Sequence, residues 1–356
     1  MVTMKDVGRE AGVSAMTVSN VLRGNTNVTP ETAKRVREAA DKLHYRLNTT
    51  SLSARSLRVS TSRHGRNFST IGLAIFELDR PYPSQLASLI SQAAEKRGYQ
   101  TVVQETRINA ENERSIIERV SNQFCDGLIF SSSRLSAAEI EQLSNHRPTV
   151  LLDDDRPQQD IDTILTPSEA GAQAAIEYLW GTGKRHIGIV GGLGDNLVNA
   201  AGEDNDTSAT FDINDTRHRR LMGCYNAFEK LGVQWKDVPI IATPWTDTDA
   251  RKAIAGNADL VRSCDALFCM TDTTAFGVIR GLKDIGLRVP DDIAVMGFDG
   301  IEMGAIMTPS LTTVAVDIPM VAQKAVDLLI ERIDDESDRE RQRIVADFHI
   351  AQRESA

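Results

Sequence analysis

Apolar positions near the N-terminus recur at helical spacing in three short stretches. These positions are Val7 and Ala11, then Val18, Val21 and Leu22, then Val36, Ala40 and Leu43. The spacing predicts three helices that share one small core. Gly12 is placed to end the first helix, Ser14 to cap the second, and Thr29-Pro30 to begin the third. The short turn between the first two helices predicts a helix-turn-helix, although an ordinary helical hairpin has the same pattern.

From Thr70 onward, apolar segments alternate with segments of helical spacing. The apolar segments are IGLAIF, TVVQE, GLIFS, TVLLD, HIGIVGG, PIIAT, ALFCM and IAVMGF. This alternation predicts strands and helices in turn, and therefore parallel sheets covered on both faces. Eight such strands over about 250 residues fit a barrel, one wide sheet or two Rossmann-like lobes, and the pattern alone does not choose among them.

Composition and charge divide the chain into unlike parts. Its 356 residues exceed one ordinary domain, and its hydrophobic share of 41% is that of a globular protein. The net charge of −10 taken alone argues against a nucleic-acid partner. Residues 1–58, however, hold 10 Lys and Arg against 5 Asp and Glu, so a basic head precedes an acidic body. This division favours a head that binds DNA.

Several classes of protein are disfavoured by what the sequence lacks. No apolar run reaches the roughly 18 residues of a membrane-spanning helix, and the N-terminus has no signal-peptide stretch, so we expect a cytoplasmic protein without membrane contact. The cysteines form no CxxC pair, which predicts buried free thiols and neither a metal site nor a disulfide. They are Cys125, Cys224, Cys264 and Cys269.

An enzyme and a transport protein are the competing functional classes. The glycine turn at Gly191–Gly194 follows a strand but lacks the third glycine of a dinucleotide-binding motif, and no Ser/His/Asp set is evident. We therefore expect no enzymatic activity and no cofactor. A stand-alone sugar-binding transport protein would share the body, but it would carry a signal peptide and no basic helical head.

The head has a specific resemblance. Residues 4–46, MKDVGREAGVSAMTVSNVLRGNTNVTPETAKRVREAADKLHYR, resemble the headpiece of the lactose-repressor (LacI/GalR) family almost position by position. The resemblance implies that the second helix enters the major groove of double-stranded operator DNA. The base-reading positions would be Ala15, Met16 and Asn20, and the positions near phosphates would be Thr3, Ser14, Thr17, Ser19 and Thr29. The alternative for Met16 is packing in the core.

The segment after the head also resembles the family. Ala54–Arg58 matches its hinge helix, which lies in the minor groove and kinks the duplex. Leu57 would be the wedge between bases, and Arg55 a minor-groove or phosphate contact. Leu47 stands where the family has proline, and Thr49–Ser51 are three extra residues that we expect to loop out. An unstructured linker is the alternative, since the following stretch is polar.

The body resembles the effector domain of the same family. The matching segments include DGLIFS, KRHIGIVGG, RRLMGCYNAF, the run from MTDTT to GFDG, PSLTTVAVD and the final QRES. The resemblance implies a periplasmic-binding-protein-like (type I) fold of two Rossmann-like lobes. One lobe would contain Thr70–Leu165 with a return near Gly300–Asp317, and the rest of the body would form the other.

An effector site follows from the same resemblance. Its residues would be Tyr82, Ser131, Asp153, Arg220, Trp245, Thr271, Asp272 and Asp299. Trp245 is placed only by its position after a strand, and a surface or core aromatic is the alternative. Arg220 and Asp299 would bind ligand hydroxyls, or would form a salt bridge that holds the lobes together. The acidic stretch 199–216 is expected to be a solvated loop beside this cleft.

These observations define one overall prediction. Residues 1–58 form a helix-turn-helix headpiece with a hinge helix, residues 59–69 a linker, and residues 70–356 an effector-binding and dimerisation domain. We expect a repressor whose affinity for a palindromic operator is modulated by a small molecule, a sugar or sugar derivative. Because no heptad segment follows the final strand, we expect a homodimer and not a tetramer. A regulator that binds a partner protein in place of a small ligand is the alternative.

Overall fold

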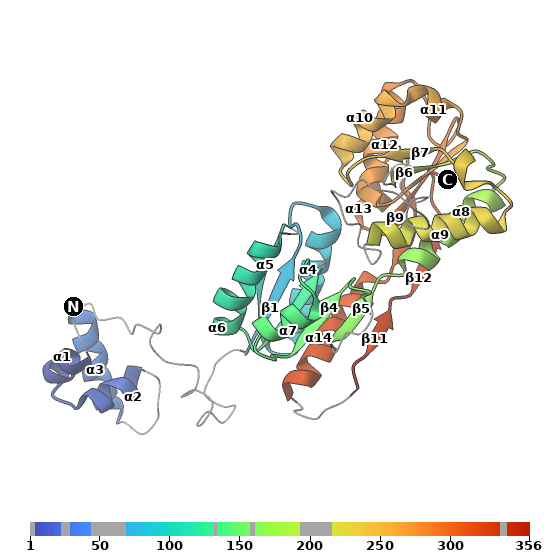
Figure 1. The fold of residues 1–356 in the computed structure, drawn as a ribbon. Coiled ribbons are helices and arrows are strands. Elements are labelled where there is room, and N and C mark those ends of the chain that lie inside the picture. The colour runs from blue at the N-terminus through green and yellow to red at the C-terminus, as the bar shows by residue number, and fades with distance from the viewer. Residues whose placement is uncertain are drawn as a thin grey trace. The chain divides into compact units, whose positions relative to one another are not determined.

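The computed structural model describes residues 4–22, 29–43, 69–107, 109–131, 134–156, 161–192, 216–334 and 340–356. The chain divides into two compact units, residues 1–68 and residues 69–356 (Figure 1). The predictions about Thr3, Arg55 and Leu57, the hinge helix and the acidic stretch up to Asp215 concern residues outside this description.

The N-terminal unit has the three helices that the pattern predicts. They are α1 (Met4–Ala11), α2 (Ala15–Leu22) and α3 (Pro30–Lys42). One core is formed by buried Val7, Ala11, Val18, Val21, Val36, Ala39 and Ala40. The tight turn after α1 depends on two glycines. Gly12 has a φ of +68°, and a Cβ on Gly8 would lie 2.7 Å from the Val13 carbonyl oxygen.

The second unit contains two six-stranded sheets of the Rossmann type. The first has the order β11-β5-β4-β3-β1-β2, and all of its strands are parallel. Its strands are β1 (Ser69–Ile75), β2 (Tyr99–Glu105), β3 (Gly127–Ser131), β4 (Thr149–Leu152), β5 (Asp162–Leu165) and β11 (Arg343–Val345). Its helices are α4 (Pro81–Lys96), α5 (Ala110–Ile116), α6 (Asn122–Phe124), α7 (Ala137–Leu143) and α14 (Ile318–Asp334), with a π-helical turn at Ile117–Ser121. We call this sheet with its helices the first lobe.

The second sheet has the order β12-β10-β9-β8-β6-β7, in which only the β10–β12 pair is antiparallel. Its strands are β6 (Ile187–Gly192), β7 (Ile240–Ala242), β8 (Ala266–Cys269), β9 (Ala294–Asp299), β10 (Thr312–Val316) and β12 (Phe348–Ala351). Its helices are α8 (Ser168–Gly181), α9 (Thr216–Lys230), α10 (Asp247–Gly256), α11 (Ala258–Arg262), α12 (Asp272–Asp284) and α13 (Met303–Ile306), with a 3₁₀ turn at Trp235–Asp237. This sheet with its helices is the second lobe.

Alternating side chains place a core on each face of both sheets. In β1, Ile71 and Leu73 join the core that includes α4 and α14, whereas Ala74 joins the opposite core. In β8, Phe268 joins the core that includes α8 and α9, whereas Leu267 joins the one beneath α10 and α12. All eight predicted strands are present, and of the three architectures that the pattern allowed the molecule has two lobes.

The predicted boundary between the lobes is wrong in one segment. Gly300–Asp317 was expected to return to the first lobe, but β10 within it pairs in parallel with β9 and extends the second sheet. The return is made by α14, which packs against α4 and β3, and by β11, which pairs with β5. The chain then ends in the second lobe with β12. Among the described residues, no helix is long and apolar enough to span a membrane.

Candidate functional site

The predicted DNA-reading helix keeps its polar face out of the head's core. Val18 and Val21 of α2 are buried, whereas the Met16 side chain is 73% exposed. Core packing, the alternative for Met16, is therefore excluded. Ala15, Thr17, Ser19 and Asn20 are half-buried and Ser14 is exposed. An exposed thioether in a small domain is available for apolar contact with a ligand.

Two of the predicted phosphate contacts are helix caps in the free protein. The Ser14 hydroxyl accepts a hydrogen bond from the Thr17 amide at 3.1 Å and lies 2.9 Å from the Thr17 hydroxyl. The Thr29 hydroxyl likewise accepts from the Thr32 amide at 3.4 Å. These caps fix the first turns of α2 and α3, and each hydroxyl lies beside backbone amides of the kind that contact phosphate oxygens.

The predicted effector residues lie at the carboxyl ends of parallel strands in both lobes. Tyr82, Ser131 and Asp153 follow or end β1, β3 and β4 of the first lobe. Trp245, Thr271, Asp272 and Asp299 follow or end β7, β8 and β9 of the second lobe, and Arg220 lies in the first turns of α9. Strand ends of this kind are where open α/β sheets bind ligands.

Arg220 is the centre of a buried group in the second lobe. Its Nη2 donates to Asp299 Oδ1 at 3.0 Å, its Nη1 donates to the Met270 carbonyl, and its side chain is 3% exposed. The guanidinium stacks 3.7 Å from the centroid of the Phe298 ring and 5.2 Å from that of Trp245. Burial raises the pKa of Asp299 to about 6, although Arg220 opposes this rise.

Tyr82 connects this group to the first lobe. Burial raises the pKa of its hydroxyl well above the usual range, and the nearby carboxylates of Asp153 and Asp299 add to the rise while Arg220 opposes it. The hydroxyl is buried and has no hydrogen-bond partner among the described residues, and the same is true of the Arg220 Nε. A protonated phenol and a guanidinium N–H are thus available as donors among acidic and basic neighbours.

Three predicted effector residues, Ser131, Thr271 and Asp272, are buried, and two of them make hydrogen bonds that support the fold. Asp272 is 0% exposed, and its carboxylate accepts from the Thr313 hydroxyl at 2.6 Å and from the amides of Gly300 and Ile301 at 2.9 Å each. It therefore holds the segment after β9 in place. Thr271 caps α12 by accepting from the Thr274 amide at 3.0 Å, and Ser131 is 1% exposed at the end of β3.

The salt bridge between Arg220 and Asp299 does not hold the lobes together, because both residues belong to the second lobe. Other contacts cross between the lobes. Arg219 Nη2 lies 3.7 Å from Asp153 Oδ1, and Arg80 donates to the carbonyl of Trp245. The Glu302 amide also donates to Gln85 Oε1 at 3.4 Å.

Comparison with known proteins now identifies the family. A model of bacterial regulatory proteins of the lacI family matches residues 3–48, and a model of the periplasmic binding protein-like domain matches residues 176–356. The HTH-type transcriptional repressor PurR of Aliivibrio fischeri is 30% identical over 345 residues, which are 96% of this chain and 94% of that protein. The chain belongs to the LacI family.

Solved structures agree in fold along the whole chain. The lac repressor dimer bound to operator superposes with a TM-score of 0.69 at 24% identity, over 99% of this chain and 98% of that one. The complex of the transcriptional regulator CelR with cellobiose gives a TM-score of 0.68 at 23% identity, over 100% of both chains. This LacI-family protein is therefore a DNA-binding transcriptional regulator with a helix-turn-helix head and a periplasmic-binding-protein-like body, and its relatives are regulators and not enzymes.

The glycine turn that suggested a nucleotide site has a packing role here. Gly191 has a φ of +100°, and a Cβ on it would lie 2.9 Å from Trp245 Nε1. The indole N–H donates to the Gly191 carbonyl at 2.9 Å. The glycine thus lets Trp245 lie against β6, next to Arg220. Trp245 is therefore half-buried and packs against the group around Arg220, so it is not an isolated surface aromatic.

Sequence reasoning missed three arginines of this region. Arg217 stacks 4.9 Å from the Trp245 ring centroid, Arg219 contacts Asp153, and Arg80 reaches the Trp245 carbonyl. The signal for two of them was present in the run Arg217-His218-Arg219-Arg220 at the start of α9. Only Arg220 matched a family motif, so Arg217 and Arg219 were not predicted to belong to the site.

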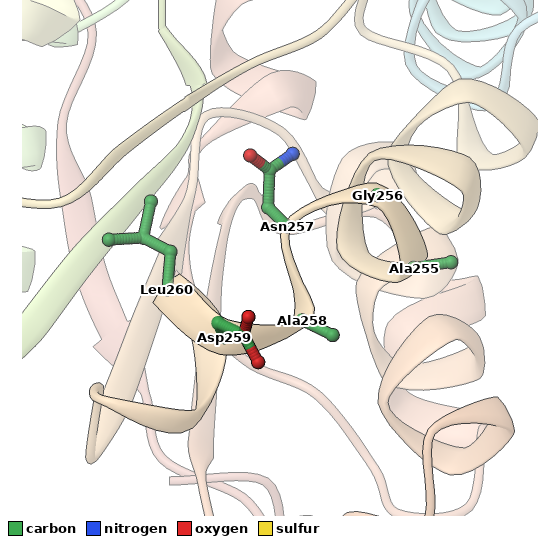
Figure 2. A pocket seen from close by; sticks show the side chains of 6 residues that line it. All are labelled: Ala255, Gly256, Asn257, Ala258, Asp259 and Leu260. Carbon is green, nitrogen blue, oxygen red and sulfur yellow. The ribbon is translucent and has the colours of Figure 1, made fainter.

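A separate pocket lies away from these residues. Figure 2 shows it at the junction of α10 and α11, lined by six consecutive residues from Ala255 to Leu260. None of the predicted effector residues lines it, and its polar side chains are one amide and one carboxylate, so we assign it no role. No group of metal-binding side chains occurs within the part of the chain that the structure describes.

Proposed function

We propose that this protein is a repressor that binds a palindromic operator as a homodimer. A sugar or sugar derivative, bound between the lobes, would lower its affinity for the operator. The single observation that carries the proposal is that Tyr82, Asp153, Arg220, Trp245 and Asp299 meet from both lobes. Two buried donors in this group, the Tyr82 hydroxyl and the Arg220 Nε, have no partner in the described ranges of the chain. Such donors suit the hydroxyls of a polar ligand.

The proposed DNA contacts come from the head and the hinge. Met16, Ala15 and Asn20 would contact base edges, and Thr3, Ser14, Thr17, Ser19 and Thr29 would contact phosphates. Leu57 would insert into the minor groove with Arg55 beside it. The exposure of Met16 and the caps at Ser14 and Thr29 support the first two assignments. A two-fold operator follows from a two-fold protein, as in the lac repressor dimer on its operator.

The proposed effector contacts fall into two kinds. Arg220, Asp299, Tyr82 and Asp153 would bind hydroxyls, and Trp245 would stack on a sugar face. Ser131, Thr271 and Asp272 would support the site from the strand ends. A sugar is favoured because CelR, which shares the fold, binds cellobiose. As a DNA-binding protein it would act at the nucleoid, in the cytoplasm.

The switch follows from the contacts between the lobes. A ligand changes operator affinity only as far as it binds two lobe arrangements differently, and this coupling is typically about 1–3 kcal/mol. The contacts of Arg219 with Asp153 and of Arg80 with Trp245 are those that a bound ligand would alter.

The test is to sequence the genomic DNA that the purified protein retains, with and without candidate sugars. We expect enrichment of one palindrome and its loss with one sugar. Enrichment that no small molecule alters would favour the alternative, a regulator controlled by a partner protein, and calorimetry against metabolite pools would check that result.

A further inference from the structure

Arg219 differs from two arginines of the body with similarly covered side chains, Arg220 and Arg332, in how its charge is balanced. Arg220 bonds to Asp299 at 3.0 Å, and Arg332 bonds to both oxygens of Asp162 at 2.7 and 3.0 Å. Arg219 is 9% exposed, and its nearest carboxylate oxygen among the described residues, Asp153 Oδ1, lies 3.7 Å away. That distance is too long for a hydrogen bond.

Within the part of the chain that the structure describes, the hydrogen bonds of Arg219 go to neutral oxygens. Its Nη2 donates to the Asp153 carbonyl at 3.4 Å and to the Thr216 hydroxyl at 3.3 Å. Its Nε is buried and has no partner among the described residues. A guanidinium offers five N–H donors in a planar fork that fits a carboxylate or phosphate, so most of this capacity is unused.

Asp153 cannot easily move to pair with Arg219. Its Oδ1 already accepts from the Thr166 amide at 2.7 Å and from the Thr166 hydroxyl at 2.6 Å. Its backbone φ of +57° fixes the residue in the left-handed region, in the turn after β4. The carboxylate is therefore held by its own lobe, and Arg219 of the second lobe is left with an incomplete counter-charge.

Donors that suit the rest of a small polar molecule lie close by. Tyr82 has both Asp153 and Arg220 as electrostatic neighbours. Neither its hydroxyl nor the Arg220 Nε has a hydrogen-bond partner among the residues that the structure describes. Arg217 adds a further guanidinium against the Trp245 ring. Cationic and hydroxyl-binding groups thus occur together where the two lobes meet.

We propose that the effector is an anionic sugar derivative, a sugar acid or a sugar phosphate, whose negative group binds Arg219. This inference rests on the proposed function and narrows its ligand class. Carboxylate or phosphate oxygens would accept from the Arg219 fork, including its Nε, at short distance. They would also stand beside the fixed carboxylate of Asp153, which would repel them.

This arrangement supplies a reason for the switch. The contact between Arg219 and Asp153 joins the two lobes in the free protein. An anion that takes Arg219 as its partner weakens that contact and adds repulsion with Asp153, so it favours a different lobe arrangement. A neutral sugar at the same hydroxyl-binding groups would not change this contact.

The test is calorimetry of the full chain with matched neutral and anionic ligands. The pairs are galactose with galacturonate, glucose with gluconate and with glucose 6-phosphate, and ribose with ribose 5-phosphate. We expect one anion to bind at least tenfold more tightly than its neutral counterpart. Whether that anion is a carboxylate or a phosphate then shows which of the two groups Arg219 binds.

Variants show whether Arg219 is responsible. Arg219→Gln should remove at least tenfold of the affinity for that anion, and Arg219→Lys, which keeps the charge, should restore part of the preference. Arg185→Gln is the control, because Arg185 belongs to the same lobe but is exposed, stacks on Trp180 at 4.4 Å and donates to the Trp180 carbonyl, away from the proposed site.

Several results of these experiments would contradict the inference. Equal or tighter binding of the neutral member, binding by no anion in the panel, or an anion preference that Arg219→Gln leaves intact would each overturn the inference. A neutral sugar that binds and releases operator DNA would overturn it while leaving the proposed function standing. The proposed function fails separately if the protein selects no operator.

Discussion

The head and the body use their functional side chains in opposite ways. In the head, Met16 is 73% exposed and contributes nothing to the core, so its replacement changes the surface and little else. In the body, Arg220 and Asp299 are 3% exposed and balance each other's charge. The proposed DNA-reading surface can therefore be changed without loss of stability, whereas the proposed effector site is part of the core that supports it.

The largest expected effect is in the body. Arg220→Ala leaves Asp299 buried without its counter-charge, which should cost about 3–5 kcal/mol of unfolding free energy. Chemical denaturation of the full chain measures this, and operator binding at low temperature should survive while the response to effector is lost. The control is Arg185→Ala, whose side chain is exposed. A variant as stable as the parent, with a full effector response, would remove Arg220 from the site.

The second effect is a dependence of stability on pH. Burial, with a further contribution from Asp299, raises the pKa of Asp272 to about 8, although its three hydrogen bonds oppose the rise. An unfolded Asp has a pKa near 4, which is below this folded-state value. The contribution of Asp272 to the unfolding free energy is therefore greatest below about pH 4, and it falls as the pH rises from about 4 to about 8.

The Asp272→Asn variant isolates this dependence. The slope that one proton produces is at most about 1.4 kcal/mol per pH unit. Denaturation between pH 5 and pH 8 should therefore show a flatter slope in Asp272→Asn than in the parent chain. An identical slope in both proteins would assign the pH dependence to other groups.

A smaller effect is expected at a cap in the head. Ser14→Ala removes the hydrogen bond to the Thr17 amide and should destabilise the head by about 1 kcal/mol. Ser14→Asp, which caps equally well, should restore stability but weaken DNA binding because its charge repels phosphate. Thermal unfolding and operator titration separate the two roles. If Ser14→Asp binds DNA as well as the parent, Ser14 does not approach a phosphate.

The smallest expected change in stability is at Tyr82. Tyr82→Phe removes a buried hydroxyl for which the described residues offer no partner, so the variant should be as stable as the parent or more stable by up to about 1 kcal/mol. Ligand affinity should nevertheless fall. A clear loss of stability, seen as a lower melting temperature, would mean that the hydroxyl already has a partner in the free protein.

Most strands of the body were predictable because they lie in apolar runs between turns, as β1 and β9 do. The strands that the pattern missed are short or polar at one face: β5 contains Asp162 and Thr163, and β11 begins with Arg343. β10 belonged to a matched motif, but sheet membership depends on pairing partners far apart in sequence, and its pairing with β9 could not be derived from local pattern.

The candidate site was likewise predictable from the sequence only in part. Arg220 and Asp299 could be placed by motif, and the structure pairs them. Asp272 was also placed by motif, but its hydrogen bonds to Gly300 and Ile301 depend on how the segment after β9 folds back. Arg219 stands in the basic run before Arg220, but the run alone does not show which of its side chains is buried, because the burial of Arg219 depends on the approach of the first lobe near Asp153.

The most direct test of the whole account compares Met16→Ala with Tyr82→Phe on the selected operator, each titrated with and without the effector. Met303→Ala, which shortens another exposed methionine in the body, is the control. The account predicts that Met16→Ala weakens operator binding by about 1 kcal/mol while keeping the effector-induced fold-change, and that Tyr82→Phe keeps operator affinity while losing most of that fold-change. An effector response that survives in Tyr82→Phe, or operator binding that is unchanged in Met16→Ala, would contradict it.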